Sequence, residues 1–310
     1  MNPKKILIAD DLHPSFKEEA EKLGYVVDDL PDLTYSQTLE IISQYKGMAI
    51  RTKFRVDKPL IDAAENLEFI ARAGAGMDNI DEEYATSKGI VCFNAPEGNR
   101  DAVAEHAMGM LLSLMNNLRK ADNEVRNRIW DREGNRGYEL KNKTVAIIGY
   151  GNTGRSFARK LRGFEVDVIV FDKYKTGYSD DFGREVSMDE IVKFADIISF
   201  HIPLTRETRQ LVDDEYLFHF RKPIFLINTA RGEIVNTQAV LNSIKQGKVL
   251  GAAFDVIEVE KFPALTEQQW FAELVDSGKV LLSPHVAGWT FESYRKISAV
   301  LAEKLKNLHL

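Results

Sequence analysis

Short apolar runs alternate along this chain with stretches in which apolar residues recur every three or four positions. The runs are three to five residues long and rich in β-branched residues, which is typical of buried strands. The other stretches have the period of amphipathic helices. Strands are expected at Lys5–Ala9, Met48–Ile50, Phe69–Ala71, Val145–Ile148, Asp167–Phe171, Ile197–Phe200, Ile224–Asn228, Gly251–Asp255 and Val280–Leu282. Helices are expected at Pro14–Leu23, Ser36–Gln44, Lys58–Ala64, Asp101–Leu118, Thr153–Arg162, Met188–Ala195, Thr237–Gln246 and Phe291–Leu308.

This alternation predicts an α/β fold in which helices cover both faces of parallel sheets. Two sheets are expected, because the helix Asp101–Leu118 and the polar stretch Asn123–Asn142 separate an early strand–helix series from a second one that begins at Val145. The last helix follows the final strand and could pack on the first sheet. The prediction is a discontinuous first domain, 1–98 with 288–310, and a second domain, 99–287. The stretch 123–142 could be a helix, a dimer clasp or a mobile segment.

Composition and charge narrow the class of protein. The 310 residues suffice for two medium domains, and a net charge of −6 argues against a nucleic-acid-binding surface. The single cysteine, Cys92, cannot form an internal disulfide, and no Cys/His cluster has the spacing of metal ligands. The start of the sequence does not resemble a signal peptide, and the longest apolar runs fall short of the ~20 residues that span a membrane. We expect a cytoplasmic protein without metal, nucleic-acid or membrane partners.

A glycine motif follows the strand expected at Val145–Ile148. Its three glycines have the spacing GxGxxG, and a helix pattern begins directly after them. In such a loop the first glycine permits a tight turn, the second lets the backbone approach a pyrophosphate, and the third lets helix and strand pack closely. The helix N-terminus offers free N–H groups to the phosphates. The residues expected to bind a dinucleotide here are Gly149, Gly151, Asn152, Thr153, Gly154 and Arg155.

The next strand supplies an acid at the position that would meet the ribose. Asp172 stands eighteen residues after Gly154, where a carboxylate accepts hydrogen bonds from ribose hydroxyls and repels a 2′-phosphate. The cofactor is therefore expected to be NAD rather than NADP, although Lys173 comes next and weakens that preference. The alternative is a structural glycine turn followed by a surface aspartate.

Three further stretches end in polar residues at the C-terminal ends of expected strands, where open parallel sheets bind ligands. They are "INTARGEIVN" (Ile227–Asn236), "AAFDVIEVE" (Ala252–Glu260) and "LLSPHVAGWT" (Leu281–Thr290), which carry Arg231, Glu260 and His285. Each residue has an ordinary alternative. Arg231 could be a surface arginine, Glu260 a solvated acid near Glu258, and His285 a structural histidine.

Together, behind a cofactor loop, the three residues form a complete set for hydride chemistry on a 2-oxo acid. The alkoxide left by hydride transfer needs a proton, which a histidine with an ordinary pKa of ~6.5 can supply and take back. A neighbouring carboxylate orients the ring and stabilises the imidazolium. An arginine binds an α-carboxylate and polarises the adjacent carbonyl.

The motifs "GYGNTG", "HIPLTRET", "NTARG", "FDVIEVE" and "SPHVAGWT", in this order, resemble those of the D-isomer-specific 2-hydroxyacid dehydrogenases. The resemblance extends to "RAGAGMDNID" (Arg72–Asp81) and "NAPEGNRDAVAEHAMGMLLSL" (Asn94–Leu114), so it covers most of the chain. It implies two Rossmann-like domains with a cleft between them, the outer one built from both chain ends. It also implies that Arg231, Glu260 and His285 are the catalytic residues.

The resemblance implies further contacts. Asp255 is expected near the nicotinamide carboxamide, Thr205 near the cofactor, and the backbone around Ala75 and Gly76 on the substrate carboxylate. Members of this family commonly form homodimers through the nucleotide domain, using the helix at Asp101–Leu118. That helix is apolar over more than one face, which suits an interface but would look the same in a buried helix.

The sequence departs from the family in two places. Proline usually follows the catalytic glutamate directly, whereas Lys261 and Phe262 precede Pro263 here. The stretch before His285 carries "TEQQWFAELVDSG", which is bulky and acidic, and both departures could reshape the wall of the cleft. In addition, Trp289 stands where small residues are frequent, and its ring is expected to line the substrate pocket or to pack on the hinge.

Two arginines bear on the substrate. Arg51 and Arg72 each follow an expected strand of the first domain, and arginines at matching positions in the D-3-phosphoglycerate dehydrogenase subgroup are associated with the phosphorylated end of the substrate. A phosphate needs charge-assisted donors, which a pair of arginines supplies. The alternative is that both are ordinary surface cations.

The first interpretation is a short phosphoglycerate dehydrogenase that converts 3-phospho-D-glycerate to 3-phosphohydroxypyruvate in serine synthesis, with NAD. Because the sequence ends at Leu310, soon after its last helix, no C-terminal regulatory domain is expected. The alternatives are a glyoxylate/hydroxypyruvate reductase or D-lactate-type enzyme, neither of which would need the arginine pair. Another is an NADH-sensing, corepressor-like binding protein.

Overall fold

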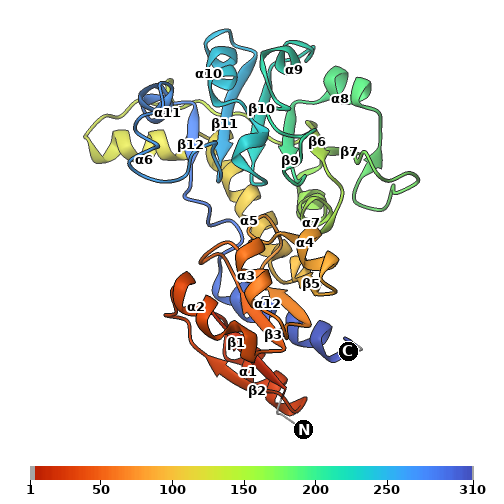
Figure 1. Cartoon of the computed structure of the whole chain (residues 1–310). Helices are drawn as coiled ribbons and strands as arrows, with labels where there is room; N and C mark the ends of the chain where they lie inside the picture. Colours follow the sequence, from red (N-terminus) through yellow and green to blue (C-terminus); the bar gives the residue numbers. More distant parts are fainter. Residues whose placement is uncertain (1–3, 309–310) are drawn as a thin grey trace. The chain divides into compact units, whose positions relative to one another are not determined.

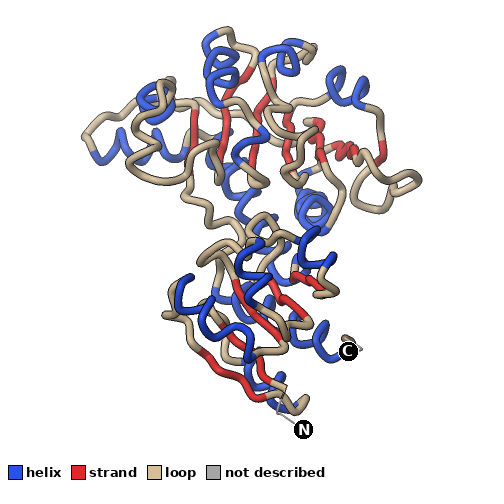
Figure 2. The backbone as a smooth tube through the Cα atoms, viewed as in Figure 1, coloured by secondary structure: helices blue, strands red, loops and turns tan. Residues whose placement is uncertain are grey.

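The computed structural model describes residues 4–308, which belong to two compact units. One unit lies within Met1–Arg100 and Trp289–Leu310, and the other is Asp101–Gly288. The parts of the predicted first domain at 1–3 and 309–310 lie outside the described residues. Each unit contains one parallel sheet covered by helices on both faces (Figures 1 and 2). The predicted fold class of two parallel-sheet α/β domains is confirmed.

The first unit has a five-stranded sheet in the order β2-β1-β3-β4-β5. Successive side chains of a strand point to opposite faces. Ile6 and Ile8 therefore pack against α1 and α12 on one face, and Leu7 packs against α3 on the other. The strands are β1 (Lys5–Ile8), β2 (Val26–Asp29), β3 (Gly47–Ile50), β4 (Phe69–Arg72) and β5 (Val91–Asn94). The helices are α1 (Ser15–Lys22), α2 (Tyr35–Ile41), α3 (Lys58–Ala63), α4 (Glu82–Ser87) and α12 (Phe291–Lys306), with the first turn of α5 (Pro96–Met115).

The second unit has a seven-stranded sheet in the order β12-β11-β10-β9-β6-β7-β8. The helices α5 and α7 cover one face of this sheet, and α8 to α11 cover the other. The strands are β6 (Thr144–Ile148), β7 (Asp167–Phe171), β8 (Arg184–Glu185), β9 (Ile197–Phe200), β10 (Ile224–Asn228), β11 (Val249–Phe254) and β12 (Val280–Leu282). The helices after α5 are α6 (Leu118–Arg126), α7 (Asn152–Leu161), α8 (Met188–Phe194), α9 (Asp214–Phe218), α10 (Thr237–Lys245) and α11 (Phe271–Asp276).

The nine predicted strands are present, and the structure adds β2, β5 and β8 within residues 4–308. All three additional strands lie at sheet edges, where one side faces solvent and no continuous apolar run is needed. The stretch 123–142, left open by the sequence, begins in α6 and continues without helix or strand.

The long predicted helix begins earlier than expected, at Pro96, and ends at Met115. Its apolar side chains, including Ala104, Leu111 and Met115, are buried in the core of the second unit. They are therefore core residues of this chain rather than a free apolar face.

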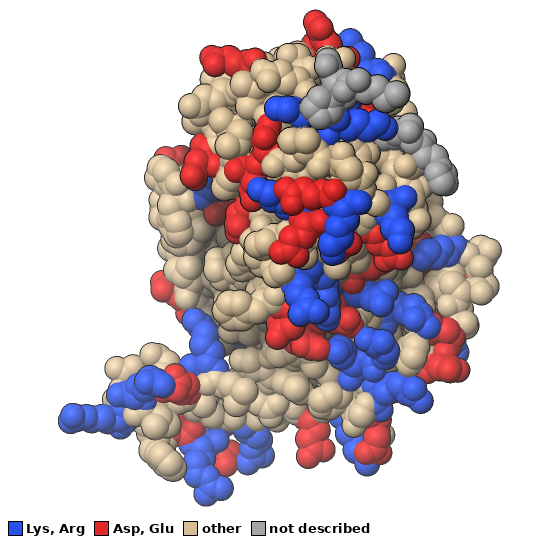
Figure 3. Space-filling model, turned by 90° about the horizontal axis from the view of Figure 1, so that it is seen from below, with Lys and Arg blue, Asp and Glu red and all other residues tan. Residues whose placement is uncertain are grey.

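Within residues 4–308, no helix is both long and apolar enough to cross a membrane. The face seen in Figure 3 carries basic and acidic side chains interspersed with one another. Among the described residues, no group of three or more His, Cys, Asp and Glu side chains is placed to hold a metal ion.

Candidate functional site

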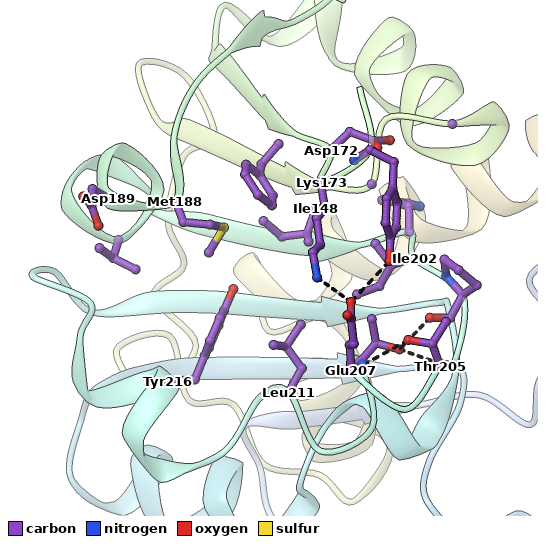
Figure 4. Close-up of a pocket in the computed structure, with 18 of the residues that line it drawn as sticks. Ile148, Asp172, Lys173, Met188, Asp189, Ile202, Thr205, Glu207, Leu211 and Tyr216 are labelled. Carbon is purple, nitrogen blue, oxygen red and sulfur yellow. Dashed lines mark hydrogen bonds and ion pairs between the residues drawn. The ribbon is translucent and has the colours of Figure 1, made fainter. Parts of the chain in front are cut away.

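A cavity of about 940 Å³ opens at the C-terminal ends of β6, β7 and β9 (Figure 4). We call it the crevice. Ligands of a doubly wound sheet bind at this edge, close to the point where the strand order reverses. In this sheet that point lies at β6. Apolar side chains supply much of its wall. Its lining includes Ile148, Gly149, Gly151, Phe171, Asp172, Met188, Ile202, Thr205, Leu211 and Tyr216.

The glycine loop has the geometry that a dinucleotide requires. Gly149 has φ of 93°, and a Cβ there would lie 2.5 Å from the carbonyl oxygen of His201. A Cβ at Gly154 would lie 2.0 Å from the carbonyl oxygen of Gly149, so strand and helix meet too closely for any side chain. At Gly151, by contrast, a Cβ would meet nothing within 4 Å. Gly151 therefore leaves open space beside the N-terminus of α7, where a phosphate can approach the backbone.

Asp172 lines the crevice directly after β7 and also stabilises the glycine loop. Its carboxylate accepts hydrogen bonds from the backbone N–H of Tyr150 at 3.0 Å and of Tyr174 at 3.1 Å. The loop and the acid thus form one unit, with the carboxylate on the wall where a ribose would follow the pyrophosphate.

Lys173 has a partner of its own. Its ammonium group pairs with Glu207, which also accepts a hydrogen bond from the Tyr174 hydroxyl at 3.2 Å (Figure 4). The carboxylate of Glu207 raises the pKa of Lys173. Because Glu207 neutralises this ammonium group, the lysine offers less attraction to a 2′-phosphate than its position in the sequence suggests.

Arg155, which the sequence predicts to bind the dinucleotide, has two side-chain partners beside the loop. Its Nε donates to Asp180 at 2.6 Å, and its guanidinium lies over the ring of Phe182 at 5.0 Å. The same aspartate accepts a hydrogen bond from the Tyr150 hydroxyl at 2.7 Å. Arg155 therefore supports the loop from outside the lining of the crevice. Asn152 and Thr153 form the first turn of α7, as expected.

Two residues after β9 complete the wall near the loop. The His201 ring bonds Ser199 at 2.9 Å, and its desolvation by the surrounding chain lowers its pKa to about 3, so it is neutral. The backbone N–H of Thr205 donates to the Thr208 hydroxyl at 2.7 Å, which in turn donates to the Pro203 carbonyl. Thr205 thus lies on the crevice wall in a loop fixed by its own hydrogen bonds.

A glutamate and a histidine meet elsewhere on the same edge of this sheet. His285 Nδ1 lies 2.8 Å from Glu260 Oε2. Because an ionised carboxylate only accepts, the Nδ1–H donates and Nε2 remains available to another group. The bond to Glu260 raises the pKa of His285, while burial and the charge of Arg231 oppose the rise. The pair can therefore hold a proton and deliver it from Nε2.

Arg231 follows β10, and its charge acts on His285. Its Nη1 donates to the Ala230 carbonyl at 2.7 Å, and its own carbonyl accepts from the Asn228 side chain at 2.9 Å. The structure thus brings together the three residues that the sequence suggested for hydride chemistry. The carboxylate of Asp255, which lies in the same unit, is buried. It accepts hydrogen bonds from the backbone N–H groups of Val286 and Ala287, each at 2.9 Å.

The comparison with known proteins bears on the same residues. The family model described as D-isomer specific 2-hydroxyacid dehydrogenase, NAD binding domain, matches residues 108–287. This range covers more than half of the chain and contains the glycine loop, Asp172, Arg231, Glu260 and His285.

The chain belongs to the D-isomer-specific 2-hydroxyacid dehydrogenase family.

Curated relatives of this chain carry several activities in their names. D-3-phosphoglycerate dehydrogenase of Archaeoglobus fulgidus is 32% identical over 98% of the chain, which spans 57% of that protein. Hydroxypyruvate reductase of Thermotoga maritima is 33% identical, with 88% of each chain covered. The solved D-lactate dehydrogenase of Aquifex aeolicus, complexed with NAD and lactic acid, is 25% identical, has a TM-score of 0.80, and covers 98% of this chain and 94% of its own. NAD is therefore the cofactor class of the matched domain.

In the first unit, Arg51 and Arg72 both lie at the C-terminal edge of the sheet, since Ile50 pairs with Arg72. The guanidinium of Arg51 lies 3.8 Å from the centroid of the Trp289 ring, and its buried Nη1 has no hydrogen-bond partner among the described residues. Arg72 folds back on Gly74, where a Cβ would lie 1.6 Å from Arg72 Nη1.

The loop after β4 contains Ala75 and Gly76, which are partly buried. The carbonyl of Ala75 accepts a hydrogen bond from the Asn94 side chain. This bond holds the backbone of the loop against β5.

Sequence reasoning missed Asp10, which shapes the segment around Arg51. The Oδ2 atom of Asp10 accepts from the backbone N–H of Arg51, Thr52 and Lys53 at 3.0, 2.7 and 2.9 Å. An acid directly after the first strand is the signal that could have pointed to it. Ser283 and His106, which contact Asp255, were also missed, and their partners are too distant in sequence to be found by spacing.

Proposed function

We propose that this protein is an NAD-dependent oxidoreductase that transfers a hydride between a D-2-hydroxy acid and nicotinamide. The observation that carries the proposal is the hydrogen bond between Glu260 and His285 Nδ1, which leaves Nε2 as a proton donor. It occurs in the same compact unit as the glycine loop and Asp172. A dinucleotide crevice and a proton donor are the two parts that this chemistry requires.

Each of the three residues has a separate role in this reaction. NADH, when bound, supplies the hydride. Arg231 holds the α-carboxylate of the 2-oxo acid and polarises its carbonyl. His285 donates the Nε2 proton to the carbonyl oxygen during reduction and removes the hydroxyl proton during oxidation. Glu260 keeps the ring oriented and favours the imidazolium form.

The crevice residues would hold the dinucleotide as the sequence predicts. Gly149, Gly151 and Gly154, with Asn152 and Thr153, would hold the pyrophosphate at the start of α7. Asp172 would accept the ribose hydroxyls, Thr205 would contact the cofactor, and Asp255 would lie near the carboxamide. Arg155 would act from behind the loop through Asp180.

For the substrate we propose 3-phospho-D-glycerate, oxidised to 3-phosphohydroxypyruvate at the start of serine synthesis. Arg51 supports this choice, because its buried Nη1 is a donor without a partner among the described residues and Trp289 fixes its guanidinium. Arg72 would add a second cation, and the backbone at Ala75 and Gly76 would bind the carboxylate. Curated relatives named D-3-phosphoglycerate dehydrogenase agree with the proposal.

The second candidate is reduction of hydroxypyruvate or glyoxylate. The relative named hydroxypyruvate reductase matches this chain over 88% of both lengths, which favours this activity over D-lactate chemistry. A corepressor-like, NADH-sensing role would keep the cofactor crevice without turnover.

The domain roles and the assembly belong to the same proposal. The residues within 1–98 and 288–310 would form the substrate domain, and 99–287 the NAD-binding domain. We propose a homodimer through the NAD-binding domain and a place in the cytoplasm, where NAD-linked metabolism of small acids occurs.

The test is a set of initial rates with NADH and 3-phosphohydroxypyruvate, hydroxypyruvate, glyoxylate and pyruvate. The expected result is the highest kcat/KM with the phosphorylated substrate, and a loss of about tenfold or more for that substrate alone in Arg51→Gln, because a charged hydrogen bond is worth 1.5–3 kcal/mol. Faster turnover of an unphosphorylated acid would assign the second candidate. Absence of turnover with all four would contradict the enzymatic proposal and favour a binding protein.

A further inference from the structure

A hydrogen-bonded network connects α5 to the segment that carries His285, and Asp255 is its buried member. His106 Nε2 lies 2.9 Å from the hydroxyl of Ser283, and this hydroxyl donates to Asp255 Oδ1 at 2.6 Å. The same His106 nitrogen lies 3.5 Å from Asp255 Oδ1. His106 comes from the middle of α5, far in sequence from the other two residues, so only the packing of α5 on the sheet brings them together.

The direction of these bonds follows from the chemistry of the partners. The single hydroxyl proton of Ser283 points to Asp255 Oδ1, which accepts it. The oxygen of Ser283 must then accept from His106, which fixes the proton of His106 on Nε2. The chain of donors runs one way, from His106 through Ser283 to Asp255, and hydrogen bonds aligned in this way strengthen one another.

Asp255 uses the rest of its acceptors to hold the backbone around His285. Its carboxylate accepts the N–H groups of Val286 and Ala287, each at 2.9 Å, and its carbonyl accepts the His285 N–H at 2.7 Å. His285 itself has φ of 54°, in the left-handed region that costs energy for a residue with a side chain. Such a conformation persists only where the surroundings impose it.

We propose that His106 is a positioning residue for His285. It acts through Ser283 and Asp255, which together fix the left-handed backbone of His285 and so aim its ring at Glu260. This inference rests on the proposed function, because it assigns to His285 the proton transfer. It adds a residue of α5 that touches neither Glu260 nor His285 in any described hydrogen bond.

The network lies close in sequence to both points at which the chain passes between the two units. The chain passes between the two compact units at Arg100–Asp101, within α5, and at Gly288–Trp289. His106 follows the first crossing by less than two helical turns, and Ala287 directly precedes Gly288 at the second. Asp255 therefore anchors, within the second unit, both segments through which the chain enters and leaves it.

The test compares His106→Leu, His106→Gln and Ser283→Ala with the wild type. His106→Leu is expected to lower kcat for the preferred 2-oxo acid by about 10- to 100-fold, since small misplacements of a reacting group cost about that much. Binding of ADP-ribose, which needs only the glycine-loop side of the crevice, should change less than about twofold. His106→Gln keeps an N–H donor at a similar reach and should recover most of kcat.

A double-variant cycle separates this route from independent effects. If His106 acts through Ser283, the variant His106→Leu with Ser283→Ala should be little worse than either single variant. Met110→Leu is the matched control, because Met110 Sδ lies 3.9 Å from the Ser283 hydroxyl and the substitution changes packing while keeping the network. It should retain kcat.

A nitrogen-15 NMR titration of His285 supplies a readout without substrate. The ring should lose part of its bond to Glu260 in His106→Leu, so its pKa should fall toward the ordinary value, and His285→Ala identifies the resonances. Unchanged kcat and unchanged His285 titration in His106→Leu would overturn the inference, as would additive effects in the double variant. If the wild type reduces no 2-oxo acid, the proposed function fails, and the His285 titration still decides whether His106 positions the ring.

Discussion

At the scale of single residues, two glutamates after β11 have different partners although they stand two positions apart. Glu258 accepts from the Gln210 side chain at 2.7 Å and from the Thr237 N–H at 3.1 Å, so it fixes the start of α10. Glu260 meets His285 instead. The sequence analysis named Glu260 for the role beside the histidine, and the contacts of the two acids differ.

The Glu260–His285 bond predicts a shift in pH dependence. The carboxylate raises the pKa of His285, so the protonated ring needed for reduction persists to higher pH. In Glu260→Gln the charge is lost, and the pKa of His285 should fall toward its ordinary value. The alkaline limb of kcat/KM for reduction should therefore move to lower pH, as measured by initial rates from pH 5 to 10.

The control for this prediction is Glu267→Gln, which removes an exposed carboxylate from the same segment of the chain. Its pH profile should match that of the wild type. An unchanged alkaline limb in Glu260→Gln would assign the proton to a group other than His285.

The position of Asp172 predicts that the protein binds NADH more tightly than NADPH. A carboxylate at the ribose repels a 2′-phosphate, and Glu207 neutralises the nearby Lys173. Asp172→Asn keeps an oxygen to accept from the Tyr150 N–H but removes the charge. It should tighten NADPH binding by about tenfold or more, as measured by calorimetry, because relief of about 1.4 kcal/mol of repulsion is a factor of ten.

Asp189→Asn is the matched control, since Asp189 is another carboxylate that lines the crevice (Figure 4). It should leave the ratio of the two dissociation constants unchanged. Equal effects of the two substitutions would mean that total charge, rather than the ribose contact, sets the preference.

At the scale of elements, position within a sheet decided which strands the sequence revealed. The central strands β6, β9 and β10 are buried almost throughout and read as continuous apolar runs. The missed strand β2 has an exposed Val26 and two aspartates, because it lies at an edge. Edge strands alternate between core and solvent, so their pattern is short and ambiguous.

The β6–α7 unit predicts different outcomes for two of its glycines. Gly151→Ala should leave the melting temperature unchanged, because its Cβ would meet no atom within 4 Å, but it should weaken NADH binding about tenfold or more by filling the space beside the helix N-terminus. Gly154→Ala should lower the melting temperature, because its Cβ would lie 2.0 Å from the Gly149 carbonyl oxygen.

Thermal unfolding and NADH fluorescence titration measure the two effects separately. Normal NADH affinity in a folded Gly151→Ala protein would place the pyrophosphate away from the glycine loop. An unchanged melting temperature in Gly154→Ala would show that helix and strand can separate at no cost.

At the scale of the whole molecule, the helix that the sequence suggested as an interface differs from the segment that follows it. The apolar side chains of α5 belong to the core of its own unit. The segment 118–138, which begins with α6 and which we call the arm, instead exposes large apolar side chains. They are Leu118, Val125, Ile129, Trp130 and Tyr138, and Trp130 is 80% exposed. Exposed apolar side chains gathered in one segment are typical of a surface that another chain covers.

The exposed apolar side chains of the arm predict that it contributes to the dimer contact. If it forms the homodimer contact, Trp130→Glu combined with Ile129→Glu should convert dimer to monomer in light scattering coupled to size-exclusion chromatography. A charge buried at an interface without a partner is costly, so dissociation should rise by orders of magnitude.

Phe291→Glu is the control, because Phe291 is 95% exposed but lies in α12 of the other unit. It should leave the dimer intact. A wild type that is monomeric, or a dimer unaffected by the arm substitutions, would contradict the role of the arm.

The sequence by itself determined the features that depend on local order along the chain. Alternation of apolar runs and helical periods predicted two parallel α/β domains, and the glycine spacing before Asp172 predicted the dinucleotide loop, because a strand, a turn and a helix N-terminus are contiguous. The tertiary structure decided what depends on residues distant in sequence. It paired Glu258 with Gln210, gave Arg155 to Asp180, stacked Trp289 on Arg51, and joined His106 to Asp255. Side-chain partners across a sheet edge follow from strand order and packing, which no local pattern specifies.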